Sequence, residues 1–139
     1  MRSTHTSPRG AHVDAWPKRI DAITLFVEDL DSAKAFYRDV FGLPIHFQNA
    51  DSAVFKFGET VINLLRVTNA DELISPAVVA PPDAGSRMVF TIGVDDVDAM
   101  CEVLAARGVE LLNGPMDRPW GIRTASFVDP AGYIWEIAK

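Results

Sequence analysis

The sequence LFVEDLDSAKAFYRDVFG, residues 25–42, predicts a strand followed directly by an amphipathic helix. Four of residues 28–32 are acidic or hydroxyl-bearing, namely Glu28, Asp29, Asp31 and Ser32, as is typical of the start of a helix. Gly42 is a favoured residue just beyond a helix end, and Pro44 prevents continuation. Between these signals, apolar residues recur with helical spacing at Ala33, Phe36, Tyr37, Val40 and Phe41.

Strands are expected on both sides of this helix. The segment Arg19–Val27 is mostly apolar on both faces, which is typical of a strand in a sheet that is covered on both sides. Three short strands are expected after the helix, with Gly58-Glu59 as the turn between the last two: Ile45–Gln48, Ala53–Phe57 and Thr60–Val67. Residues 18–67 are therefore predicted to form a βαβββ module.

The same order is predicted again after a linker. Residues 68–86 are rich in proline and carry one helical turn around Ala70–Ile74. Residues 87–139 then predict a strand at Arg87–Val94, a helix from Val97 to Gly108, and strands at Val109–Leu112, Trp120–Val128 and Tyr133–Ala138. The run VEDLD at 27–31 aligns with VDDVD at 94–98. The chain is thus predicted to be an internal duplication of the α+β class, with residues 18–139 as one domain.

The first 17 residues are predicted to be a disordered tail, because they are polar and lack periodicity. Trp16 either docks on the domain or stays free. The tail has no apolar core of a secretory signal, and no apolar run approaches the length of a membrane helix. These features predict a cytoplasmic protein with no membrane partner.

Charge and composition exclude several classes of function. The 139 residues carry a formal net charge of −6, so nucleic acid is not an expected partner. Cys101 is the single cysteine, which excludes an intrachain disulfide and a cysteine-rich zinc site. Of the three histidines, His5 and His12 lie in the tail, which leaves His46 for the folded part.

The duplicated module resembles the vicinal-oxygen-chelate superfamily, which groups glyoxalase I, bleomycin-resistance proteins and extradiol dioxygenases. The resemblance rests on residues 25–42 and 94–98, on WGIR at 120–123 and on FVDPAGYIWE at 127–136. It implies a cup-shaped, eight-stranded mixed sheet with the helices on its outer face and a ligand cleft inside. It also implies a homodimer.

In metal-using members, the resemblance places ligands on the first and last strands of each half, at positions equivalent to Ala22, Asn63, Val89 and Glu136. Alanine and valine side chains cannot bind a metal, an asparagine oxygen is a weak ligand, and glutamate alone is a good one. We therefore expect no cofactor and no tightly bound divalent metal.

The predicted function is metal-independent binding of a small molecule, such as sequestration of a toxin or antibiotic. The alternatives are a lyase, isomerase or dioxygenase of the same superfamily with an atypical or absent metal site, and a structural dimer with an empty cleft.

The candidate catalytic residues are Glu136, which lies in an apolar strand, and His46, for which a surface position is the competing interpretation. Trp120 is expected to offer a flat aromatic surface to a ligand. Arg123 is expected to offer its planar guanidinium. Alternatively, Trp120 packs the loop and Arg123 pairs with Glu136 or Asp117. Further ligand-binding candidates are Phe26, Thr24, Asn63 and Thr91.

A type I turn at residues 129–132 would place Ala125 opposite Glu136 in the last hairpin. Trp120, Arg123 and Glu136 are then expected to converge on one concavity, because side chains alternate between the faces of a sheet.

Overall fold

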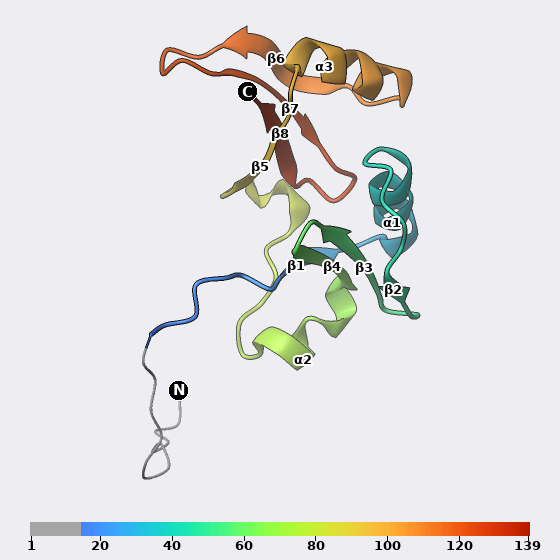
Figure 1. Cartoon of the computed structure of the whole chain (residues 1–139). Helices are drawn as coiled ribbons and strands as arrows, with labels where there is room; N and C mark the ends of the chain where they lie inside the picture. The colour runs from blue at the N-terminus through green and yellow to red at the C-terminus, as the bar shows by residue number, and fades with distance from the viewer. Residues whose placement is uncertain (1–14) are drawn as a thin grey trace.

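Residues 15–139 are described by a computed structural model, in which they form two βαβββ modules (Figure 1). The first module consists of β1 (Ala22–Val27), α1 (Leu30–Asp39), β2 (Phe47–Gln48), β3 (Ser52–Phe57) and β4 (Thr60–Arg66). The second consists of β5 (Val89–Gly93), α3 (Val97–Ala106), β6 (Leu111–Asp117), β7 (Arg123–Val128) and β8 (Ile134–Ala138). Between them lie η1 (Val67–Asn69), α2 (Asp71–Ile74) and η2 (Pro82–Ala84).

The two modules have the same sheet topology. The strand orders are β1-β4-β3-β2 and β5-β8-β7-β6. In each sheet, the first strand of the module runs parallel to the last strand, and the other pairs are antiparallel. The predicted α+β duplication is confirmed as two four-stranded mixed sheets. Their closure into one eight-stranded cup stays a prediction.

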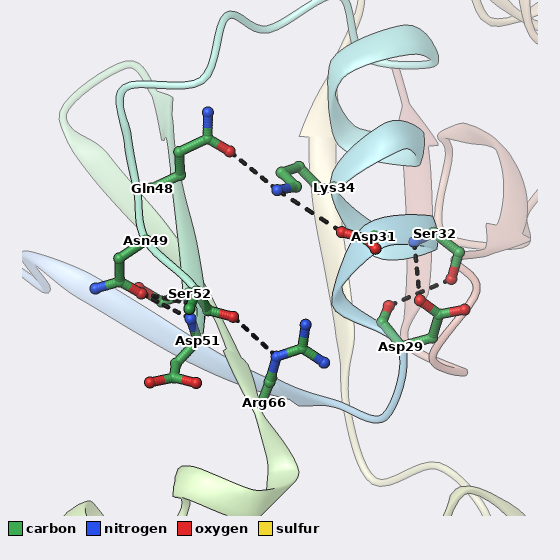
Figure 2. Close-up of polar contacts among 10 residues, drawn as sticks. Asp29, Asp31, Ser32, Lys34, Gln48, Asn49, Asp51, Ser52 and Arg66 are labelled. Carbon is green, nitrogen blue, oxygen red and sulfur yellow. Dashed lines mark hydrogen bonds and ion pairs between the residues drawn. The ribbon is translucent and has the colours of Figure 1, made fainter.

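Both long helices begin at an aspartate cap. Asp29 Oδ1 accepts a hydrogen bond from the Ser32 amide at 3.2 Å, and Asp96 Oδ1 accepts one from the Ala99 amide at 3.1 Å. Figure 2 shows the first cap, together with Lys34, whose Nζ donates to Gln48 Oε1 at 2.9 Å and so ties α1 to β2. The acidic runs at the helix starts therefore serve as caps, as the sequence predicted.

The modules share one hydrophobic core, and a buried polar network lies inside it. The Tyr37 hydroxyl on α1 donates to Asp129 Oδ2 at 2.7 Å and accepts from Trp135 Nε1 at 3.2 Å. Asp129 Oδ1 in turn accepts from the Ala131 and Tyr133 amides, both at 2.9 Å. The helix of the first module is thereby bonded to the last hairpin of the second. Throughout the described part of the chain, no buried side-chain polar atom lacks a partner.

Aromatic rings surround this network. The ring of Trp135 lies 4.9 Å from that of Phe41 and 5.1 Å from that of Phe57, between centroids. Outside the network, the Tyr133 hydroxyl donates to the Phe26 carbonyl at 2.9 Å, which adds a second link between the modules. Contacts across the two modules therefore combine apolar packing with specific hydrogen bonds.

The β6–β7 hairpin differs from its prediction. β6 runs to Asp117 instead of ending at Leu112, and β7 begins at Arg123 instead of Trp120. Gly114-Pro115 signals a break in the sequence, since proline lacks an amide donor. β6 is an edge strand that pairs with β7 alone, so it tolerates the proline, at the cost of two irregularities in its register.

Two further expectations concern the chain ends and the membrane. Trp16 is 80% exposed and does not dock on the domain. The predicted disorder of the tail, including His5 and His12, falls on residues 1–14, which lie outside the described residues. None of the helices in residues 15–139 is long and apolar enough to cross a membrane.

We expect Tyr37→Phe to lower the free energy of unfolding by about 1–3 kcal/mol, because it leaves the buried Asp129 carboxyl without its side-chain donor. Urea unfolding measures the loss. Tyr133→Phe removes a hydroxyl from a half-buried site and is the matched control, with a smaller expected loss.

The loss should also grow with pH. Burial raises the pKa of the Asp129 carboxyl, and the bond from Tyr37 opposes that rise. Without the hydroxyl the folded-state pKa rises further. When the pKa of a carboxyl is higher in the folded than in the unfolded state, the protein loses stability as pH rises through the folded-state pKa. The stability lost in Tyr37→Phe should therefore be larger at neutral pH than at about pH 3. A deficit that does not change with pH would contradict this account.

Candidate functional site

Two equivalent polar pairs lie on the faces of the sheets that point away from the core. Thr24 is paired with Asn63 in the parallel register of β1 and β4, and Thr91 with Glu136 in that of β5 and β8. Asn63 Nδ2 donates to Thr24 Oγ1 at 3.4 Å, and Thr91 Oγ1 donates to Glu136 Oε1 at 2.8 Å. We call the face with Thr24 and Asn63 the first polar face, and the face with Thr91 and Glu136 the second polar face.

The alternation of each strand explains this placement. Leu25 and Val27 are 2% and 0% exposed and point into the core, so Thr24 before them and the half-buried Phe26 between them point the other way. The same alternation along β8 buries Trp135 and Ile137 and leaves Glu136 half-buried on the opposite face. The duplication has therefore placed a threonine hydroxyl next to a polar last-strand residue in both modules.

The residues at the four implied ligand positions do not fit a tightly bound divalent metal. Ala22 and Val89 carry no donor atom. The remaining donors are one amide and one carboxylate, and each already has a threonine hydroxyl as its hydrogen-bond partner. Within residues 15–139, no group of three or more histidine, cysteine or acidic side chains is arranged to hold a metal ion.

Arg123 lies on the other face of the sheet from Glu136, so the predicted convergence of these two residues is wrong. Ser126 is the residue opposite Glu136, and Arg123 pairs through its backbone with Lys139. The reason is the turn: the Asp129 amide donates to the Tyr133 carbonyl at 2.9 Å, so three residues separate the paired ends instead of two. One extra turn residue shifts the register and moves Arg123 to the opposite face.

Arg123 instead forms ion pairs on the side of α3. Its Nη2 lies 3.0 Å from Asp98 Oδ1, and its Nη1 lies 3.0 Å from Asp117 Oδ1. The alternative prediction, that Arg123 pairs with Asp117, is confirmed. The hydrogen bonds that the guanidinium donates to Asp98 and Asp117 raise its pKa.

Trp120 and His46 do not lie on the polar faces. Trp120 is 68% exposed in the turn between β6 and β7, where the Gly121 amide donates to the Arg118 carbonyl at 3.0 Å. His46 is exposed just before β2. Its position agrees with the surface interpretation of this histidine.

Arg118 lies on the second polar face, and the sequence did not single it out. Its Nε donates to Thr124 Oγ1 at 2.8 Å, and its Nη2 donates to Asn113 Oδ1 at 3.3 Å. Thr124 is fully buried and precedes Ser126 by two residues on the same face of β7. Met116 is paired with Thr124, and Arg118 follows Met116 by two residues. Strand alternation would therefore have indicated that Arg118 shares a face with Thr124, had β6 been predicted to continue past Pro115.

Two cavities adjoin these faces. The first, of about 310 Å³, lies under the linker and is mostly apolar, with walls that include Phe26, Val78, Met88 and Ile134. The second, of about 640 Å³, is more open and lies between the modules, with walls that include Phe57, Phe90 and Thr91. Phe26 of the first module therefore lines the first cavity and Thr91 of the second module lines the second, and both cavities are large enough for a small molecule.

Comparison with known proteins relates this arrangement to one large group. The family model described as the glyoxalase/bleomycin resistance protein/dioxygenase superfamily matches residues 19–137. The uncharacterized protein YraH of Bacillus subtilis (strain 168) is 36% identical over 121 residues, which cover 84% of this chain and 94% of YraH.

Solved structures show the same relationship. A glyoxalase-related enzyme from Fulvimarina pelagi is 30% identical with a TM-score of 0.75, and the match covers 88% of each chain. A lactoylglutathione lyase from Agrobacterium tumefaciens is 28% identical with a TM-score of 0.70, over 88% of this chain and 93% of the lyase.

Proposed function

The chain belongs to the glyoxalase/bleomycin resistance protein/dioxygenase superfamily, and we propose that within it the protein binds a small organic molecule without a metal ion. The observation that carries the proposal is the donor set at the four implied ligand positions. Ala22 and Val89 offer no ligand atom, and Asn63 and Glu136 are each bonded to a threonine hydroxyl. One amide and one carboxylate do not hold a divalent ion tightly.

The polar faces retain the capacity to bind a ligand. A carboxylate has two acceptor oxygens, so Glu136 can accept further hydrogen bonds after that from Thr91. Asn63 offers both a donor and an acceptor to a ligand. With Phe26 and Val89 nearby in the strands, the faces combine apolar walls with a few fixed polar groups, which is the usual composition of a small-molecule site.

A second copy of the chain completes the site in this proposal. β1 and β5 are edge strands of their sheets. Around β5, Met88 and Val89 are 53% and 50% exposed, and Ile20 before β1 is 66% exposed. A two-fold partner would cover these edges and apolar side chains, and would enclose the polar faces that one chain leaves open.

The similarity to the lyase structure favours one alternative, a metal-free or atypical lyase. In such an enzyme Glu136 would act as the proton-transferring group, because it is the one acidic side chain at the four implied ligand positions. Binding without turnover of any bound molecule distinguishes the proposed binder from this enzyme.

We expect the purified protein to carry no stoichiometric zinc, nickel or iron by elemental analysis. Added zinc or nickel should leave the melting temperature unchanged, since a ligand stabilises the folded state only if it binds there. A metal that survives dialysis against a chelator, and is lost in Glu136→Gln, would contradict metal-independent binding.

A screen of small organic molecules by thermal shift should yield compounds that raise the melting temperature of the full chain. Glu136→Gln keeps an acceptor for Thr91, so the variant should fold, with a free energy of unfolding within about 1 kcal/mol of the wild type. It should weaken the binding of these compounds. Arg123→Ala, on the opposite face, is the control and should bind them as the wild type does. Compounds that bind all three proteins equally would place the site elsewhere.

Light scattering should give the mass of a dimer at micromolar concentrations. Val89→Asp places a charge on the exposed apolar edge and should shift the mass toward that of a monomer, because a buried unpaired charge is costly at an interface. Leu112→Asp is the control, since Leu112 is 54% exposed on β6, at the opposite edge of the same sheet from β5. A monomer mass for the wild type would contradict the proposed assembly.

A further inference from the structure

Arg118 is held in place by two neutral side chains. Its Nε donates to the buried Thr124 hydroxyl at 2.8 Å and its Nη2 donates to Asn113 Oδ1 at 3.3 Å. Among residues 15–139, no carboxylate forms an ion pair with Arg118, whereas Arg123 contacts two. The positive charge of Arg118 is therefore fixed in position and has no ion-pair partner among these residues.

The remaining donors of Arg118 are free to bind a ligand. A guanidinium has five N–H donors in one plane, and two of them are engaged. Its planar fork matches the geometry of a carboxylate. Because two protein acceptors already restrict the side chain, a ligand would bind it at a small cost in side-chain entropy.

The register places this guanidinium on the same face of the sheet as Glu136, beside the neighbouring strand β7. Ser126 is opposite Glu136, and Thr124, the partner of Arg118 Nε, is two residues away on the same face. Two residues along a strand span about 7 Å, and neighbouring strands lie about 5 Å apart. A molecule that spans this diagonal would contact the positive group at one end and the Glu136 carboxylate at the other.

We propose that Arg118 is the anion-binding residue of the second polar face, and that the ligand is an organic acid whose hydroxyl or amino group donates to Glu136. This inference rests on the proposed function and names its ligand class. The net charge of −6 repels anions from the molecule as a whole, so an acid would need a local cation of this kind. The competing explanation is that Arg118 only braces the β6–β7 hairpin.

The test uses small carboxylic acids that carry a hydroxyl or amino group at their far end, each paired with its primary amide, with 4-hydroxyphenylacetate and 4-hydroxyphenylacetamide as the first pair. Each is titrated into the ¹⁵N-labelled full chain and followed by NMR. We expect each acid to shift backbone amides at residues 118–126 and 134–138, and to bind about tenfold more tightly than its amide, as one charge-assisted hydrogen bond implies.

Variants separate the two explanations. Arg118→Gln should abolish the preference for acid over amide, Arg118→Lys should retain part of it, and Arg123→Ala should retain all of it. A hairpin brace alone predicts loss of stability without loss of preference. Melting temperatures show whether each variant folds. If Arg118→Gln does not fold, Arg118→Lys is compared with the wild type: a reduced preference for acid over amide supports anion binding, and an unchanged preference supports the hairpin brace.

Two results would overturn the inference in distinguishable ways. If acids and amides bind this face equally, or if Arg118→Gln keeps the preference, the face binds small molecules and the assignment to Arg118 is wrong. If none of the pairs shifts resonances of either polar face, the proposed function and the inference fail together.

Discussion

The hydrogen bond from Tyr37 to Asp129 joins residues 92 positions apart, and the arrangement of the two modules depends on it. Asp129 is 4% exposed and yet satisfied on both oxygens, by the tyrosine hydroxyl and by amides of its own turn. The same aspartate thus shapes the last hairpin and links it to the helix of the other module. A buried network of this kind rigidifies the core when every member is satisfied.

The hairpin geometry explains which parts of the site the sequence predicted. The duplicated order of elements and the helix caps follow from short-range patterns in the chain, whereas the pairing of Thr24 with Asn63 and of Thr91 with Glu136 depends on the parallel strand register. The face of Arg123 depended on whether two or three residues separate the ends of one turn, and the bonds of Asp129 within the turn decide that. Arg118 was missed because the predicted strand ended at Leu112, whereas the edge strand β6 continues through Pro115 to Asp117.

The duplication has produced two faces of the same geometry and different charge. A threonine hydroxyl lies next to a neutral amide on the first polar face and next to a carboxylate on the second. The second face also holds the guanidinium of Arg118, whereas the cation that alternation places on the first face is the exposed Lys56. The second module thus offers a carboxylate where the first offers an amide, and it holds its cation by hydrogen bonds to two neutral side chains.

The irregular strand β6 has a consequence for how the chain avoids unwanted contacts. Each sheet has two edges, formed by β1 and β2 in one and by β5 and β6 in the other. β2 is two residues long, and β6 carries Pro115 and two register shifts, so neither presents a regular row of amides and carbonyls to a foreign strand. The regular edges are β1 and β5, next to the polar faces. Protection from aggregation at one side of each sheet thereby leaves the other side as the place where strand pairing between molecules can occur.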